Sequence, residues 1–202
     1  MKLYFSPGSC SLSPHIALRE AGLPFALERV NLKDKRCASG ADYRAINPMG
    51  SVPALALDDG DVLTEGPAIV QYIADRNPEA KLAPLAGTPA RYHLAQLLNF
   101  LSTEVHKAFA PLFWSKSPDV QQLFRGKLAG AFTNVVAKRL AAGPWLMGAD
   151  YTVADCYLYA LVNRWPKVHE IDMGPWPEIT DFVARMAARP AVQAAHQAEA
   201  AL

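Results

Sequence analysis

Cys10 is the residue of this sequence that is best placed to do chemistry. It lies in the stretch SPGSCSLSPH, between a short apolar strand pattern and an apolar helix pattern that begins at Ser11 or Leu12. Unpaired N–H groups and the positive end of the helix dipole favour the thiolate there, which is the nucleophilic form of cysteine. The position predicts a reactive thiol, and the alternative is a buried, inert cysteine.

Ser13 forms a C-x-x-S pattern with Cys10, which is the one-thiol version of the C-x-x-C redox motif. Because no second cysteine stands in the motif, a mixed disulfide at Cys10 has to be resolved by a thiol from solution. The pattern therefore indicates a small thiol as the partner. It is short, and by itself it does not separate a redox centre from a structural cysteine.

Two further segments suit a peptide-like ligand. Val52 precedes Pro53 at the entrance to an apolar strand, so the N–H and C=O of Val52 are free to pair with an extended ligand. The bond between them is cis or trans, and trans is commoner.

Glu65 and Gly66 open a helix pattern whose first amides suit a carboxylate, while Glu65 suits an ammonium group. The alternative is an ordinary capped helix.

A polar stripe runs along the segment NFLSTEVHKAFAPLFW. Asn99, Thr103, His106 and Lys107 share one face at helical spacing. Such a stripe usually faces solvent. If it faces a cleft instead, His106 is the acid/base or hydrogen-bond partner for a thiolate, and Lys107 is an electrostatic one.

These residues have to be positioned by two kinds of structure. Residues 1–80 alternate strand and helix patterns in the order βαβαββα, with GADYRAIN at 40–47 as the second helix. A linker at 81–88 follows, and the patterns over 89–202 are all helical. The sequence predicts an α/β domain joined to an all-α domain.

A capping box marks the start of one helix in the second domain. In YTVADC, Thr152 stands at the N-cap and Asp155 stands three residues later, so each side chain reaches the other residue's backbone N–H. Tyr151 and Cys156 occupy the flanking staple positions. We therefore expect Cys156 to be a packed, structural residue.

Composition narrows the classes of function. The 202 residues include three scattered cysteines, which form neither a disulfide framework nor a metal-ligand pattern. The formal charge of +1 offers no broad basic face for nucleic acid or lipid. We expect an intracellular, cytoplasmic protein without metal, whose partners include neither nucleic acid nor membrane.

With these motifs in order, the whole chain resembles the bacterial beta class of glutathione S-transferases. The resemblance rests on MKLYFSPGSCSLSPHIALREAGL, SGADYRAINPMGSVPAL, LDDGDVLTEGPAIVQYIAD, LNFLSTEVHKAFAPLF and GADYTVADCYLYAL. It implies a thioredoxin-like domain joined to a helical domain, a cytosolic homodimer, and a substrate cleft between the domains.

The resemblance also implies how glutathione binds. Glu65 and the Gly66 backbone take the γ-glutamyl head, and Lys35 attracts the glycyl carboxylate. Val52, beside Pro53, pairs its backbone with the cysteinyl centre. The rest of the site consists of Cys10 facing the glutathione sulfur and of helical-domain residues, namely Asn99, Thr103, His106 and Lys107, with Glu104 reaching the other subunit's site.

Three positions depart from the family pattern. Phe5 stands where many members have tyrosine, Gly66 where many have serine, and Ser51 where lysine or glutamine is common. The aromatic residues that could form an apolar wall for a second substrate, or equally pack in the core, are Phe109, Phe113, Trp114 and Trp165.

The function that follows is conjugation of glutathione to a small hydrophobic electrophile, with thiol transfer through a mixed disulfide at Cys10. Disulfides are the second class of expected partner. A non-catalytic protein that stores or senses glutathione or a hydrophobic ligand on the same scaffold is the alternative.

Overall fold

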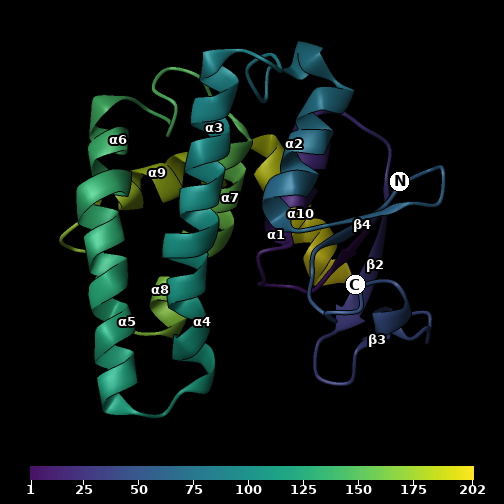
Figure 1. The fold of residues 1–202 in the computed structure, drawn as a ribbon, viewed down its shortest axis with the longest axis horizontal. Helices are drawn as coiled ribbons and strands as arrows, with labels where there is room; N and C mark the ends of the chain where they lie inside the picture. Colours follow the sequence, from purple (N-terminus) through teal and green to yellow (C-terminus); the bar gives the residue numbers. More distant parts are fainter.

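The computed structural model describes residues 1–202, in which a small sheet-bearing part precedes a larger helical part (Figure 1). The strands are β1 (Lys2–Phe5), β2 (Ala26–Asn31), β3 (Arg36–Cys37), β4 (Ala54–Ala56) and β5 (Val62–Thr64). The helices are α1 (Leu12–Glu20), α2 (Gly66–Arg76), α3 (Pro89–Phe100), α4 (Lys107–Trp114), α5 (Pro118–Ala131), α6 (Ala137–Ala142), α7 (Val153–Val162), α8 (Trp165–Val168), α9 (Pro177–Ala187) and α10 (Pro190–Ala201). Short 3-10 turns are η1 (Tyr43–Ala45) and η2 (Pro78–Ala80), and π-helical segments are η3 (Leu101–His106) and η4 (Phe132–Val136).

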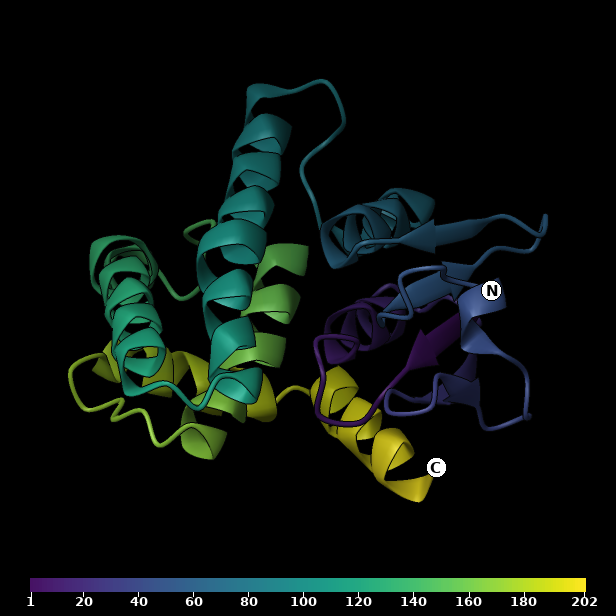
Figure 2. The same ribbon diagram turned by 60° about the horizontal axis from the view of Figure 1, so that its bottom comes forward.

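The sheet has five strands in the order β3-β2-β1-β4-β5. The central strand β1 pairs in parallel with β2 and antiparallel with β4, so the sheet is mixed. Helices α1 and α2 lie between the sheet and the helical part, and both pack against α7 (Figure 2). The expected fold class, an α/β domain followed by helices, is confirmed.

The helix expected over residues 40–47 is shorter than the pattern indicated. Only the 3-10 turn η1 forms there. The side chain of Asp42 accepts a hydrogen bond from the backbone N–H of Arg44 at 3.0 Å, and such local bonds compete with a regular helix. Pro48 then disfavours helical geometry at Asn47. The short strand β3, which the patterns did not indicate, pairs with β2 beside this turn.

Helix α7 is buried along its entire length at the centre of the molecule. All ten of its residues are buried, and they belong to a core that joins the sheet-bearing part and the helical part. The capping box expected at its start is present: Thr152 N–H donates to Asp155 Oδ2 at 2.8 Å, and Ala154 N–H donates to Thr152 Oγ1 at 3.3 Å. Asp155 Oδ1 also accepts from the backbone N–H of Leu146 at 2.9 Å. Cys156 is fully buried, which confirms its structural role.

The last helix, α10, returns from the helical part to pack against α1 (Figures 1 and 2). The contact includes a buried polar chain in which Arg19 Nε donates to His15 Nε2 at 3.0 Å. His15 therefore carries its proton on Nδ1, which lies 3.0 Å from Glu199 Oε1. Arg189, at the start of α10, also pairs with Glu20 at 2.6 Å. These contacts fix α1, the helix that follows Cys10.

Replacement of Asp155 by alanine should lower the free energy of unfolding by about 3 kcal/mol, because it removes the helix cap and leaves the buried N–H of Leu146 without an acceptor. Urea denaturation of both proteins at equal concentration measures the difference. The matched control is Asp150→Ala, since Asp150 is exposed and its side chain makes no hydrogen bond. Equal losses in the two variants would show that the cap does not stabilise the fold.

Candidate active site

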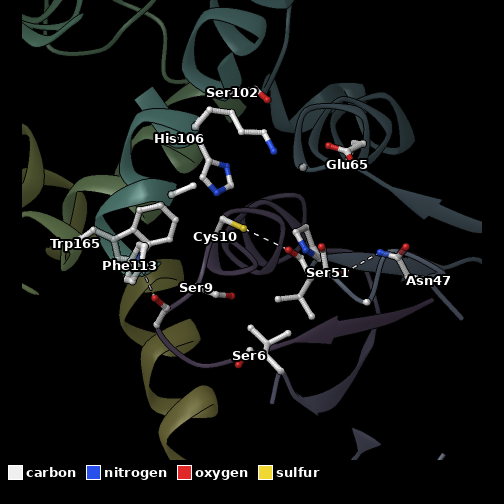
Figure 3. Close-up of a pocket in the computed structure, with 18 of the residues that line it drawn as sticks. Ser6, Ser9, Cys10, Asn47, Ser51, Glu65, Ser102, His106, Phe113 and Trp165 are labelled. Atoms are coloured by element: carbon white, nitrogen blue, oxygen red, sulfur yellow. Dashed lines mark hydrogen bonds between the residues drawn. The ribbon is translucent and has the colours of Figure 1, made fainter. Parts of the chain in front are cut away.

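One cavity of ≈ 530 Å³ lies between the two parts of the molecule (Figure 3). It is lined by the β1–α1 loop, the residues before β4, the start of α2, and residues of η3, α4, α7 and α8. The expected site residues that line it are Cys10, Lys35, Val52, Pro53, Glu65, Gly66, His106 and Lys107.

The β1–α1 loop presents the Cys10 thiol to this cavity. Gly8 holds φ at +73°, and its carbonyl accepts a hydrogen bond from Trp165 Nε1 at 3.0 Å, which ties the loop to α8. Cys10 Sγ donates to the carbonyl of Val52 at 3.4 Å. Burial raises the pKa of the Cys10 thiol to about 12 and outweighs the effect of its own backbone N–H. In the unliganded protein Cys10 is therefore a neutral thiol at neutral pH, and not the thiolate that its position before a helix favoured.

Ser13 does not share the environment of Cys10. Its side chain is fully buried, its Oγ has no hydrogen-bond partner, and it does not line the cavity. The C-x-x-S pattern thus places a single thiol, and no second redox-motif side chain, at the cavity.

The segment before β4 offers a backbone donor. The Val52–Pro53 peptide bond is cis. Val52 N–H makes no backbone hydrogen bond, as expected, whereas its C=O, which was expected to be free, accepts from Cys10. Asn47 Nδ2 donates to the carbonyl of Ser51 at 2.7 Å and holds this segment in place. One unpaired N–H therefore stands beside the thiol.

Glu65 and Gly66 form the start of α2 at one end of the cavity. Glu65 has φ +66° and ψ 115°, a backbone conformation that costs a non-glycine residue about 1–3 kcal/mol. Its carboxylate does not cap the helix and lines the cavity instead. The carboxylate and the first helical amides thus stand side by side.

Lys35 lines the cavity as well, and its Nζ donates to the carbonyl of Gly50 at 2.9 Å.

His106 reaches the cavity from the helical part. Its Nδ1 lies 2.8 Å from the hydroxyl of Tyr157, and its ring packs against Trp165 with centroids 5.2 Å apart. Burial, followed by the nearby charge of Lys107, lowers the pKa of His106 to about 4. At neutral pH the ring is uncharged. Figure 3 shows His106 and Cys10 among the side chains that surround the cavity.

Three residues of the expected site do not line this cavity. Asn99, Thr103 and Glu104 are exposed, while Ser102 lines the cavity together with His106. The reason is the π-helical segment η3, whose turns hold more residues than α-helical turns and rotate Asn99 and Thr103 away from the His106 face. At α-helical spacing Asn99 and Thr103 share a face with His106, whereas in the structure they do not line its cavity, so their part in the site stays a prediction.

The aromatic candidates divide into two groups. Phe113 and Trp165 line the cavity, whereas Phe109 is buried in the core and Trp114 is 71% exposed elsewhere. Phe5, the first departure from the family pattern, is fully buried and does not line the cavity.

Sequence reasoning missed Tyr157, which lines the cavity from within the apolar helix α7. No local signal distinguished it from the core residues on either side. It also missed Asn47 and Ser102, which lie within motifs quoted above but were not singled out as site residues.

No group of three or more His, Cys, Asp or Glu side chains is arranged to hold a metal ion. None of the helices combines the length and apolar character needed to cross a bilayer.

Comparison with known proteins bears directly on this site. Residues 8–76 match the family described as Glutathione S-transferase, N-terminal domain, and residues 103–198 match Glutathione S-transferase, C-terminal domain. The glutathione S-transferase GstA of Escherichia coli O157:H7 is 42% identical over 200 residues, which cover 98% of each chain.

Solved structures agree. The chain is similar to BphK, a bacterial transferase solved as a ternary complex, with a TM-score of 0.96 and 51% identity over 99% of this chain and 100% of that one. It is similar to a sphingomonad glutathione S-transferase complexed with glutathione, with a TM-score of 0.95 and 43% identity over 100% of both chains. With both halves of the chain matched and the cavity lying between them, the protein belongs to the glutathione S-transferase family.

Proposed function

We propose that the protein is a transferase that binds glutathione in this cavity and presents its sulfur to a small hydrophobic electrophile. The observation that carries the proposal is the order of groups along the cavity. Glu65 and the start of α2 suit the ammonium and carboxylate of the γ-glutamyl head. The N–H of Val52 suits the cysteinyl carbonyl, and Lys35 suits the glycyl carboxylate.

The other residues that line the cavity include polar groups for the glutathione sulfur and aromatic groups for the electrophile. Cys10 and His106 stand where the glutathione sulfur would lie, and Phe113 and Trp165 offer an aromatic surface for the electrophile. As a neutral thiol, Cys10 donates a hydrogen bond to the glutathione thiolate. Relatives named as transferases, together with this cavity, favour catalysis over a purely storage role.

Thiol transfer is the second reaction that we propose at the same site. A Cys10 thiolate attacks the glutathione sulfur of a mixed disulfide between glutathione and another thiol, the S–S bond breaks, the other thiol leaves as a thiolate, and a Cys10–glutathione disulfide forms. A second glutathione thiolate then attacks the glutathione sulfur of this disulfide, which releases the Cys10 thiolate and forms oxidised glutathione. Because burial disfavours the Cys10 thiolate in the free protein, we propose conjugation as the main activity.

The finer assignments belong to this proposal. Cys10 in its loop, together with His106, supports the beta class. Asn99, Thr103 and Glu104 are exposed and do not line the cavity, and a homodimer in which Glu104 reaches the partner's site gives Glu104 a role. The domain boundaries at 80 and 89 and a cytoplasmic location stay predictions.

Replacement of Glu65 by glutamine should raise the KM for glutathione about tenfold with little change in kcat, since the charge that holds the ammonium group is lost. Steady-state conjugation of 1-chloro-2,4-dinitrobenzene measures both constants. Glu79→Gln is the matched control, because Glu79 is exposed in η2. An unchanged KM in Glu65→Gln would contradict the placement of glutathione, and absence of turnover by the wild type would contradict the function.

Replacement of Gly66 by serine should lower the KM for glutathione several-fold. A Cβ at Gly66 would lie 3.5 Å from Tyr157 Cε2, an ordinary contact, so the site has room for the side chain. The serine hydroxyl adds a donor at the proposed carboxylate position, worth about 1 kcal/mol. Gly66→Ala is the matched control, which adds the Cβ without the hydroxyl. Equal KM values for the two variants would show that the carboxylate lies elsewhere.

Alkylation of Cys10 by iodoacetamide in the unliganded protein should accelerate about tenfold per pH unit from pH 7 to 9 without levelling off. The thiolate fraction grows in this way at any pH well below a pKa of about 12. Mass spectrometry of Cys10 peptides at timed intervals measures the rate, and a Cys10→Ala variant identifies background from Cys37 and Cys156. A plateau near pH 7 would mean that the thiol is already ionised.

A further inference from the structure

Tyr157 lies close to both His106 and Gly66 in the cavity wall, although the sequence analysis assigned it no role. It belongs to the buried helix α7 and is 2% exposed, yet it lines the cavity. Its hydroxyl meets His106 Nδ1 at 2.8 Å, and the two rings stand edge to face at 78°. Its ring also lies beneath Gly66, at the proposed γ-glutamyl end. A neutral His106 ring has one proton, on either Nδ1 or Nε2, and the contact of Nδ1 with Tyr157 bears on which nitrogen carries it.

The hydrogen bonds around the phenol determine the direction of this contact. His106 is the hydrogen-bond partner of the Tyr157 hydroxyl, and a buried hydroxyl proton requires an acceptor. Burial raises the pKa of Tyr157, so the phenol stays protonated. His106 Nδ1 is the only hydrogen-bond partner of this hydroxyl in the structure. The phenol proton therefore points to His106 Nδ1.

The second ring nitrogen is then the one that carries the proton. His106 Nε2 has no hydrogen-bond partner in the protein, and it is not among the buried polar atoms that lack one, so it opens to the cavity. With Nδ1 occupied as an acceptor, neutral His106 presents an N–H donor there. A histidine in this state donates a hydrogen bond to a thiolate, but its Nε2 cannot accept the proton of a thiol.

We propose that Tyr157 is a positioning residue that holds His106 in the Nε2–H form, so that His106 donates a hydrogen bond to the glutathione sulfur. The inference rests on the proposed function and assigns to His106 the role of donor in place of general base. The proton of the glutathione thiol leaves to water. Without the phenol, the ring distributes its proton between both nitrogens, and part of the protein presents a lone pair to a negatively charged sulfur.

The test compares Tyr157→Phe with the wild type and repeats the substitution in a His106→Gln background. Glutamine offers an amide N–H near the Nε2 position and has no tautomers. In the wild-type background, Tyr157→Phe should lower kcat/KM for 1-chloro-2,4-dinitrobenzene about tenfold at pH 6.5, raise the apparent pKa of the pH profile, and leave the KM for glutathione nearly unchanged. In the His106→Gln background the same substitution should change kcat/KM less than twofold. An equal loss in both backgrounds would overturn the proposal, because it would indicate a packing effect.

The proton position itself has an independent readout. Long-range ¹⁵N–¹H correlation spectra of ¹⁵N-histidine-labelled protein, with His106→Gln used for assignment, should show the His106 proton on Nε2 in the wild type and a tautomer mixture in Tyr157→Phe. A wild-type ring protonated on Nδ1 would overturn the proposal. Absence of turnover by the wild type would reject the proposed function instead, and the spectrum would still decide the assignment of the proton.

Discussion

The burial of α7 between the sheet-bearing part and the remaining helices is the constraint on which the rest of the structure depends. A helix without solvent along any face has to satisfy its terminal backbone groups through protein partners. Thr152 and Asp155 do this at its start, and Asp155 also binds the preceding loop at Leu146. Four elements, α1, α2, α3 and η3, all pack on this helix. The segments that carry Cys10, Gly66 and His106 are therefore held in place by contact with the same buried helix.

Enclosure by these elements also decides the charge states in the site. Cys10 and His106 are buried enough that both are neutral at pH 7, while Glu65, Lys35 and Lys107 line the same cavity. The only negative sulfur in such a site is the one that the substrate brings. A neutral donor stabilises that charge without adding a charge of its own, and Cys10 becomes such a donor once its S–H turns from the Val52 carbonyl toward the substrate sulfur.

Much of the site could be predicted because its signals are local in the sequence. Cys10 before a helix, Val52 before a proline, Glu65 at a helix start and the Thr152–Asp155 box each depend on neighbours within a few residues. Tyr157 could not be found in this way, since its role depends on a contact with His106 that spans 51 residues. The rotation of Asn99 and Thr103 away from the cavity depends on the π-helical segment η3, which a search at the α-helical period does not detect. At η1 the prediction failed for a local reason, because the side chain of Asp42 accepts a hydrogen bond from the backbone N–H of Arg44 and competes with the expected helix.

The contact between His15 and Glu199 has a consequence for the order of events during synthesis. The two residues are 184 positions apart, and α10, which carries Glu199, packs against α1, which carries the fully buried His15. Chains emerge from the ribosome with the N-terminal part first. Helix α1 therefore leaves the ribosome with the face that packs on α10 uncovered and with His15 lacking its Glu199 partner, and both conditions last until residues near position 199 have been translated. The loop that carries Cys10 thus precedes a helix whose packing is completed only after α10 has been made.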